Sequence, residues 1–122
     1  MSAVEIRAEL KEGTACIYPG PYLNQLRGED IENHCKELLS SGLRQIIINF
    51  KETELINSIG ISILLGVIEA VNDARGRLVL TNLSESNREL FEMLGLMSHV
   101  EIEETEEAAL AKMREAAESA AR

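Results

Sequence analysis

Residues 45–69 constrain the fold more than any other part of the chain, because an apolar strand pattern is followed closely by a long apolar helix pattern. Three consecutive isoleucines, Ile46 to Ile48, form the centre of the first segment. Successive β-branched side chains are typical of a strand that is buried on both faces. The segment after Ser58 is too long and too rich in unbranched and small residues for a second strand, so it predicts a helix. We expect the Ser58 hydroxyl to cap this helix and to be exposed at its tip.

Length and charge limit the classes of protein that the chain can belong to. The 122 residues and the apolar content of 45% predict one compact domain, residues 1–122. The net charge of −9 argues against nucleic acid or an anionic membrane as a partner, and a basic protein surface fits better. The longest nearly apolar stretch, residues 59–68, is about half of the ~20 residues that a membrane-spanning helix needs. Charges in the first ten residues are unlike a signal peptide, so we expect a cytoplasmic protein without membrane insertion.

The cysteines and histidines give no sign of a metal or cofactor site. Cys16 and Cys35 show neither a CxxC spacing nor a Cys/His ligand pattern, so we interpret them as reduced thiols. His34 and His99 are isolated from one another, and we interpret them as surface or lightly packed residues.

The remaining pattern alternates strands with helices. The expected elements are a hairpin of residues 4–10 and 14–18, a helix at 29–40 closed by Gly42, strands at 45–50 and 78–82, the helix after Ser58, a helix from Ser84 to Gly95, a short edge strand at 100–102, and a closing helix at about 105–120. This order predicts an α/β fold with a mixed, mostly parallel sheet, an N-terminal hairpin and about four helices. We interpret the glutamates of residues 101–107 as a solvated helix start.

The helix after Ser58 has two apolar faces. One stripe, at intervals of three or four, suits packing on the sheet and consists of Ile61, Leu64, Leu65, Ile68 and Val71. A second set, Ile59, Ile63, Val67 and Ala70, points elsewhere and is either covered by a neighbouring helix or free for a partner. Gly60 and Gly66 each weaken a helix by about 1 kcal/mol relative to alanine, which favours a close approach by another backbone.

Three chemistries are open to Ser58. A hydrolase nucleophile would need the G-x-S-x-G elbow, but position 56 is Ile, and Asp73 and His99 are weakly marked as triad partners. A nucleotide site would need a glycine-rich loop with a lysine, which does not precede the helix. The third is phosphorylation of Ser58 itself. A helix N-terminus tolerates the added charge, whereas a partner docked on the neighbouring apolar face would be repelled, so the modification would act as a reversible switch.

The motif Asn57-Ser58-Ile59-Gly60, between a strand and an apolar helix, resembles the Asp-Ser-Ser/Thr-Gly signature of the STAS family, in particular of the bacterial anti-sigma factor antagonists. The resemblance extends over about residues 4–113. It includes the initial hairpin, the turn at Gly20, the strand of residues 76–80 and the segment 87–96, which is similar to the family's penultimate helix and its Gly-Leu stop.

The resemblance implies a non-enzymatic switch protein that takes part in transcription regulation. Members of the family bind an anti-sigma factor that is also a serine kinase, and this binding frees a sigma factor. Phosphorylation of the serine that corresponds to Ser58 releases the partner, and a metal-dependent PP2C-type phosphatase restores the first state. The expected partner-binding residues here are Asn24, Asn57, Ile59, Gly60, Ile63 and Arg88.

Two departures from the family pattern support a rival interpretation. Asn57 replaces the aspartate of the motif, and Asn24, in a loop lengthened by Pro21 and Tyr22, replaces an acidic residue. If those carboxylates activate the serine, phosphorylation of Ser58 would be slower or lost. The chain would then be a scaffold or regulatory subunit that binds through the same face and is never phosphorylated. For Arg88, a surface salt bridge is the alternative to a partner contact.

Overall fold

The computed structural model describes residues 6–120 and contains a five-stranded sheet in the order β1-β2-β4-β6-β7. Its strands are β1 (Arg7–Lys11), β2 (Thr14–Tyr18), β4 (Gln45–Asn49), β6 (Arg77–Thr81) and β7 (Glu101–Glu103). The pair β1–β2 is antiparallel, and every other neighbouring pair is parallel. The hairpin, the mixed sheet and the edge position of the last strand are therefore confirmed. The start of the first predicted strand, residues 4–5, lies outside the described residues.

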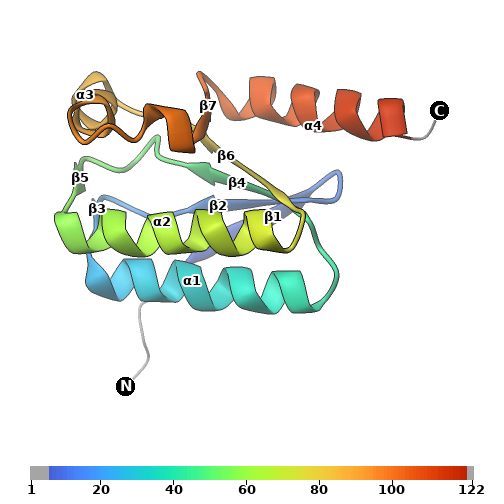
Figure 1. Cartoon of the computed structure of the whole chain (residues 1–122), viewed down its shortest axis with the longest axis horizontal. Coiled ribbons are helices and arrows are strands. Elements are labelled where there is room, and N and C mark those ends of the chain that lie inside the picture. Colours follow the sequence, from blue (N-terminus) through green and yellow to red (C-terminus); the bar gives the residue numbers. More distant parts are fainter. Residues whose placement is uncertain (1–5, 121–122) are drawn as a thin grey trace.

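Helices cover both faces of this sheet (Figure 1). On one face, α1 (Gln25–Ser40) and α2 (Ser58–Asp73) lie side by side and run in the same direction. On the other face lies α4 (Glu106–Ala120), which contributes Ala109 and Met113 to a small buried cluster. The alternating side chains of β4 explain this arrangement, because Ile46 and Ile48 join the core under α1 and α2 while Ile47 joins the cluster under α4. Burial of the isoleucines on both faces is thus confirmed.

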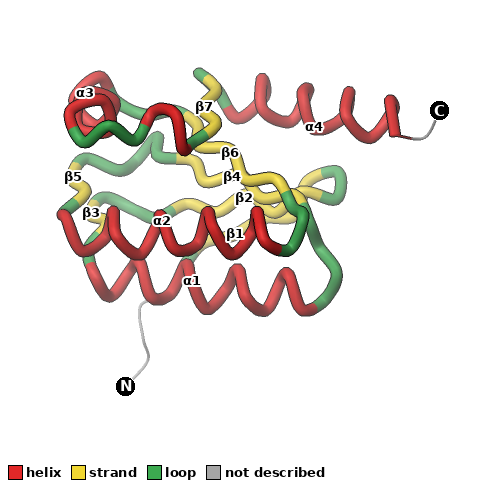
Figure 2. The backbone as a smooth tube through the Cα atoms, viewed as in Figure 1, coloured by secondary structure: helices red, strands yellow, loops and turns green. Residues whose placement is uncertain are grey.

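A second, two-stranded parallel sheet was not predicted. It pairs β3 (Tyr22–Leu23) with β5 (Leu55–Ile56), so that Leu23 lies opposite Ile56 (Figure 2). Each of these strands leads directly into a helix, β3 into α1 and β5 into α2. The small sheet therefore brings the N-termini of α1 and α2 to the same end of the molecule.

The first helix begins at Gln25, four residues earlier than the prediction of residue 29. Its N-cap is Asn24, whose Oδ1 accepts a hydrogen bond of 3.0 Å from the backbone N–H of Arg27. Gly28 is tolerated in the first turns because α2 passes close to it: a Cβ at this position would lie 3.1 Å from Ile63 Cδ1. The predicted helix started after Gly28, which the structure shows to be a contact point between α1 and α2.

The predicted helix ends are confirmed. Gly42 has φ +100° and follows α1, and the backbone N–H of Leu43 donates to the carbonyl of Leu38 across it. The helix α3 (Glu85–Met93) is capped by Ser84, and Gly95, with φ +71°, follows its end. A short 3-10 helix, η1 (Met97–His99), then leads into β7. Within residues 6–120, no helix combines the length and the apolar character needed to cross a membrane.

Candidate functional site

The two adjacent helix N-termini are built in the same way. In α1, Asn24 is followed by Gln25 and Leu26, and in α2, Asn57 is followed by Ser58 and Ile59. Each asparagine caps its helix through Oδ1, and each third residue is an exposed apolar side chain, with 49% of Leu26 and 49% of Ile59 accessible. The backbone N–H groups at the start of an α-helix lack intrahelical partners, so this end of the molecule presents positive dipole ends side by side.

Ser58 is exposed, as predicted, but it does not cap the helix. The cap is Asn57, whose Oδ1 accepts a hydrogen bond of 2.7 Å from the backbone N–H of Gly60. Ser58 is the first helical residue, and its hydroxyl has no hydrogen bond within the described part of the chain. The prediction placed the cap one residue too late because serine and asparagine are equally good caps and stand next to each other here. The correction leaves the Ser58 hydroxyl free for chemistry.

Asn57 also contacts the small sheet. Its Nδ2 donates a hydrogen bond of 3.3 Å to the hydroxyl of Tyr22, and its backbone N–H donates to the carbonyl of Leu23. The side chain therefore uses its oxygen for the cap and its nitrogen for the tyrosine. Sequence reasoning noted Tyr22 only as part of a lengthened loop, because a hydrogen bond between residues 35 positions apart leaves no local pattern.

Gly60 confirms the expected close backbone approach, and Gly66 does not. A Cβ on Gly60 would lie 2.4 Å from the carbonyl oxygen of Leu23, too close for any other residue type without a backbone shift. A Cβ on Gly66 would meet nothing within 4 Å. The first turn of α2 is thus pressed against β3, which fixes the position of Ser58 relative to Tyr22 and Leu23.

The second apolar face of α2 is mostly covered by α1. Val67 is buried, and Ile63 is half-buried against Gly28 of α1. Ile59 alone of the four predicted residues is largely exposed. The alternative of coverage within the fold therefore holds for the middle of the helix, and a free apolar side chain remains at its tip.

Exposed apolar side chains gather around this tip. Tyr22 and Leu55 are register partners in the small sheet and are 43% and 63% accessible. We call the set formed by Tyr22, Leu26, Leu55, Ile59 and Ser58 the Ser58 surface. It accounts for four of the seven large hydrophobic residues that are exposed within the described chain. A further hollow of about 320 Å³ next to it is lined by apolar side chains that include Leu55, Leu90 and Met93 and by polar ones that include Glu54 and Glu89, so a mixed surface continues onto α3.

Arg88 lies on α3 and is exposed, with its Nε 3.8 Å from Glu92 Oε1, one turn away. The predicted surface salt bridge is present, and it adds little to stability at such exposure.

The geometry excludes a catalytic triad of Ser58, Asp73 and His99. Ser58 and Asp73 are the first and last residues of α2, and at a rise of ~1.5 Å per residue they are about 22 Å apart along the helix. His99 lines a groove with Leu65 and Asn72, in the middle and last turns of that helix. A serine nucleophile, its base and its orienting carboxylate must be within hydrogen-bond reach, so these residues form no triad.

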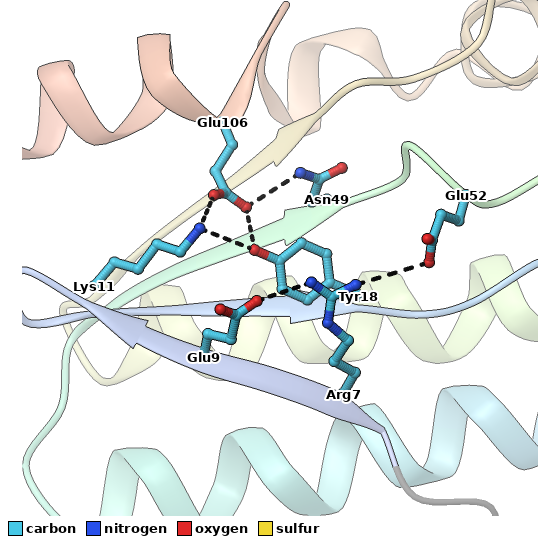
Figure 3. A network of polar contacts seen from close by, with 7 residues as sticks. All are labelled: Arg7, Glu9, Lys11, Tyr18, Asn49, Glu52 and Glu106. Atoms are coloured by element: carbon cyan, nitrogen blue, oxygen red, sulfur yellow. Dashed lines mark hydrogen bonds and ion pairs between the residues drawn. The ribbon is translucent and has the colours of Figure 1, made fainter.

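A second polar site lies on the α4 side of the sheet and was not predicted (Figure 3). Glu106, which is 5% accessible, accepts hydrogen bonds from Lys11 Nζ at 2.6 Å, Tyr18 Oη at 2.7 Å and Asn49 Nδ2 at 3.1 Å. The interpretation of residues 101–107 as a wholly solvated helix start is therefore wrong for Glu106. Its partners come from β1, β2 and β4, so only the tertiary fold reveals the cluster.

The electrostatics of this cluster follow from its hydrogen bonds. Burial alone would raise the pKa of Glu106, but the hydrogen bonds from Lys11, Tyr18 and Asn49 outweigh it and lower the pKa. The hydrogen bond to Glu106 raises the pKa of Lys11. Burial and the same carboxylate raise the pKa of Tyr18 to about 12. The cluster is a charged anchor for the first turn of α4.

Neither cysteine is part of a site. Cys16 and Cys35 are free and buried, and burial raises the pKa of their thiols to about 11 and about 12. Within residues 6–120, no group of three or more His, Cys, Asp or Glu residues could hold a metal ion.

Comparison with known proteins identifies the class. The model of the STAS domain family matches residues 5–109, and the chain belongs to this family. The predicted resemblance is thereby confirmed, and most of α4 lies beyond the matched segment.

Several similar proteins carry the description anti-sigma factor antagonist, which is qualified as "putative" for some of them. A protein of Bordetella bronchiseptica with the name "Putative anti-sigma factor antagonist BtrV" is 28% identical over 94 residues, which are 77% of this chain and 81% of BtrV. The phosphorylated form of SpoIIAA from Bacillus, a cell fate determinant, is 25% identical, with a TM-score of 0.70 over 88% of this chain and 98% of SpoIIAA. The protein TM1081 of Thermotoga maritima, at 17% identity, shares the fold with a TM-score of 0.82 over 89% of this chain and 94% of TM1081.

Proposed function

We propose that this protein is an anti-sigma factor antagonist that acts by partner switching. In its unphosphorylated form it binds an anti-sigma factor with serine kinase activity through the Ser58 surface, and phosphorylation of Ser58 releases it. A PP2C-type phosphatase returns it to the binding form. In this role the protein is a cytoplasmic, non-enzymatic regulator of transcription.

The observation that carries this proposal is the exposed Ser58 hydroxyl at a helix tip surrounded by exposed apolar side chains. Apolar residues next to a polar rim are typical of protein interfaces, and tyrosine is among their strongest contributors. Exposure gives a kinase access to the hydroxyl. The relative SpoIIAA exists in a phosphorylated form, which supports the same modification here.

The modification transfers the γ-phosphoryl group of a nucleoside triphosphate to Ser58 Oγ. The bond from the γ-phosphorus to the bridging oxygen breaks, the nucleoside diphosphate leaves, and the serine proton passes to a base of the kinase. This chain does not supply that base at position 57, because Asn57 is an amide whose oxygen already accepts from Gly60. The kinase must therefore activate the serine without help from a carboxylate at position 57.

The phosphate acts on the partner rather than on the fold. It adds about −1.5 to −2 charges at the first residue of α2, where the helix dipole and the free N–H groups stabilise an anion. A partner that covers Leu26 and Ile59 would have to desolvate the same charge. Binding is lost while the fold remains intact.

Asn24 and Asn57 bear on the rival hypothesis of a scaffold that is never phosphorylated. Both side chains act as helix caps, a role that asparagine and aspartate fill equally well. Capping therefore explains a short polar side chain at both positions, and the choice of asparagine over aspartate leaves the fold unchanged while it removes two carboxylates near Ser58. The scaffold hypothesis is separated from the switch hypothesis by experiment.

The test compares partner capture by the wild type with capture by Ser58→Ala and Ser58→Asp variants, from extracts of the native cells. The switch requires that the alanine variant retains the anti-sigma factor and that the aspartate variant loses it at least about tenfold. Ser62→Asp is the matched control, because Ser62 is also exposed on α2, one turn further along. It should bind like the wild type.

Phosphopeptide mass spectrometry on the native protein provides the second half of the test. A phosphate on Ser58 that accumulates when the phosphatase is inhibited is expected. Equal binding by both Ser58 variants, together with an unmodified Ser58 under all conditions, would establish the scaffold hypothesis instead.

A further inference from the structure

The role of Tyr22 rests on the proposed phosphorylation of Ser58 and extends it. We propose that the hydroxyl of Tyr22 donates a hydrogen bond to the phosphate on Ser58, so that Tyr22 couples the modification to the docking surface. Tyr22 is a positioning residue in this scheme, and it takes no part in the phosphoryl transfer.

The hydrogen-bond inventory around Asn57 leads to this role. The Asn57 amide offers one acceptor, which Gly60 occupies, and its Nδ2 donates to Tyr22. The Tyr22 oxygen is thus the acceptor in this contact, and its own hydrogen has no acceptor among residues 6–120. A tyrosine hydroxyl both donates and accepts, so Tyr22 has one donor left to offer. That donor lies beside Asn57, the residue bonded to Ser58.

The backbone holds this donor in place. Tyr22 belongs to β3, and the pairing of Leu23 with Ile56 fixes β3 against β5. Gly60 presses α2 onto the carbonyl of Leu23, one residue from Tyr22. The backbone of β3 at Tyr22 is therefore held next to the first turn of α2 by two independent contacts, and the hydrogen bond from Asn57 Nδ2 holds the Tyr22 hydroxyl there. A rigid donor that needs no rearrangement suits recognition of an added charge.

Tyr22 is also the one residue that belongs both to the polar contacts at the helix tip and to the exposed apolar side chains. Its ring is 43% accessible and lies beside Leu55. When its hydroxyl binds the phosphate, the charge is held against the tyrosine that a partner would cover. Docking on Tyr22 then requires desolvation of the phosphate, so phosphorylation weakens the contact with this anchor.

The experiment uses the full chain with phosphoserine installed at position 58 by genetic encoding, so it does not depend on a kinase. Phosphorus NMR follows the second ionisation of the phosphate as a function of pH. A donor stabilises the dianion, so its removal in the Tyr22→Phe variant should raise the apparent pKa of the phosphate by roughly half a pH unit. Leu10→Ala, which truncates an exposed leucine of β1 outside the Ser58 surface and changes no donor, should leave that pKa unchanged.

A second measurement needs no variant at position 22. In the phosphorylated wild type, the carbon that bears the Tyr22 hydroxyl should change its chemical shift along the phosphate titration. The same carbon of Tyr18, the other tyrosine of the chain, bonds to Glu106 and should not follow the phosphate. A shift of Tyr22 alone is the expected result.

An unchanged phosphate pKa in Tyr22→Phe, or a Tyr22 signal that ignores the titration, overturns the proposal. Neither result affects the proposed function, since the capture experiment with the Ser58 variants tests that separately. Conversely, a Tyr22 effect in the encoded phosphoprotein stands even if no kinase modifies Ser58 in cells.

Discussion

Gly60 and Gly66 show how a single residue type serves different purposes on one helix. Both lie in α2, but a side chain at position 60 would collide with the backbone of β3, while one at position 66 would extend into open space. Only Gly60 is required by the fold. Gly66 destabilises the helix by about 1 kcal/mol relative to alanine, as glycine usually does, and no close contact requires a glycine there.

Alanine at each position should therefore have opposite effects. We expect Gly60→Ala to lower the free energy of unfolding by about 1 to 3 kcal/mol, because a backbone carbonyl cannot move aside cheaply. We expect Gly66→Ala to raise it by up to about 1 kcal/mol. Urea denaturation of both variants measures the difference. Equal stability of the two variants would contradict the close approach of α2 to β3.

The residue scale also shows where the sequence was sufficient. The exposure of Ser58 followed from its place between a strand and a helix, since that junction must lie at the edge of the layered structure. The cap assignment did not follow, because Asn57 and Ser58 satisfy the same sequence rule and only coordinates separate them. The contact of Tyr22 with the helix tip was not predicted, because its hydrogen-bond partner, Asn57, is distant in the sequence.

At the scale of elements, α4 is attached to the sheet by few contacts. Ala109 and Met113 are its buried apolar residues, and Glu106 ties its first turn to three strands. The ion pair from Arg114 to Glu12 is exposed and adds little, and the pair from Lys112 to the half-buried Glu103 is exposed on the lysine side. The buried carboxylate is therefore the main polar anchor of this helix.

Because the pKa of Glu106 is lowered in the folded protein, its contribution to stability depends on pH. The contribution is complete above the unfolded value of about 4.3 and is lost as the pH falls through the lower folded value. We expect Glu106→Gln to be less stable than the wild type by about 1 to 3 kcal/mol at neutral pH. The difference should shrink as the solution is acidified below pH ~4.

Thermal denaturation of both proteins as a function of pH measures this effect. The comparison with Glu106→Gln is needed because other carboxylates, such as Glu101 beside Arg77, also titrate with a lowered pKa. A gap in stability that stays constant from neutral to acid pH would mean that the charge of Glu106 is not what matters.

Across the whole molecule, the two faces of the sheet differ in how much they bury. The face under α1 and α2 holds the large cluster that includes Ile17, Ile48, Leu64 and Phe91, whereas the apolar cluster under α4 has five buried residues within the described chain. The central strands belong to both clusters. The side chains of α4 at residues 114–119 belong to neither, since they are exposed.

Hydrogen exchange should reproduce this difference. We expect the amides of β2, β4 and β6 to exchange only through global unfolding, and those of residues 114–119 of α4 to exchange at least about 100-fold faster. These residues are exposed, and their ion pair from Arg114 to Glu12 adds little, so this end of the helix opens locally. Mass spectrometry of exchanged peptides resolves the two regions. Equal protection along the whole of α4 would show that its last turns are held by contacts that the structure does not contain.

The order of layers could be predicted because hydrophobic periodicity acts over ten to twenty residues, as in the isoleucines of β4 and the stripe of α2. Contacts between segments that are distant in the sequence could not be predicted in this way. The pairing of β3 with β5 involves strands too short to leave a pattern, and it is this pairing that brings Asn24 beside Asn57. The Glu106 cluster was missed for the same reason.

The two helix N-termini that follow β3 and β5 have the same construction, so each can serve as a control for the other. The first residue of α2 is Ser58 and the first residue of α1 is Gln25. Both helices have an asparagine N-cap and an exposed aliphatic side chain at the second helical position. A Gln25→Ser variant would offer an enzyme the same helix start twice. If only position 58 is then modified, the enzyme must recognise features other than a serine at the start of a capped helix. The two helix N-termini differ at few positions, so each difference can be tested by substitution.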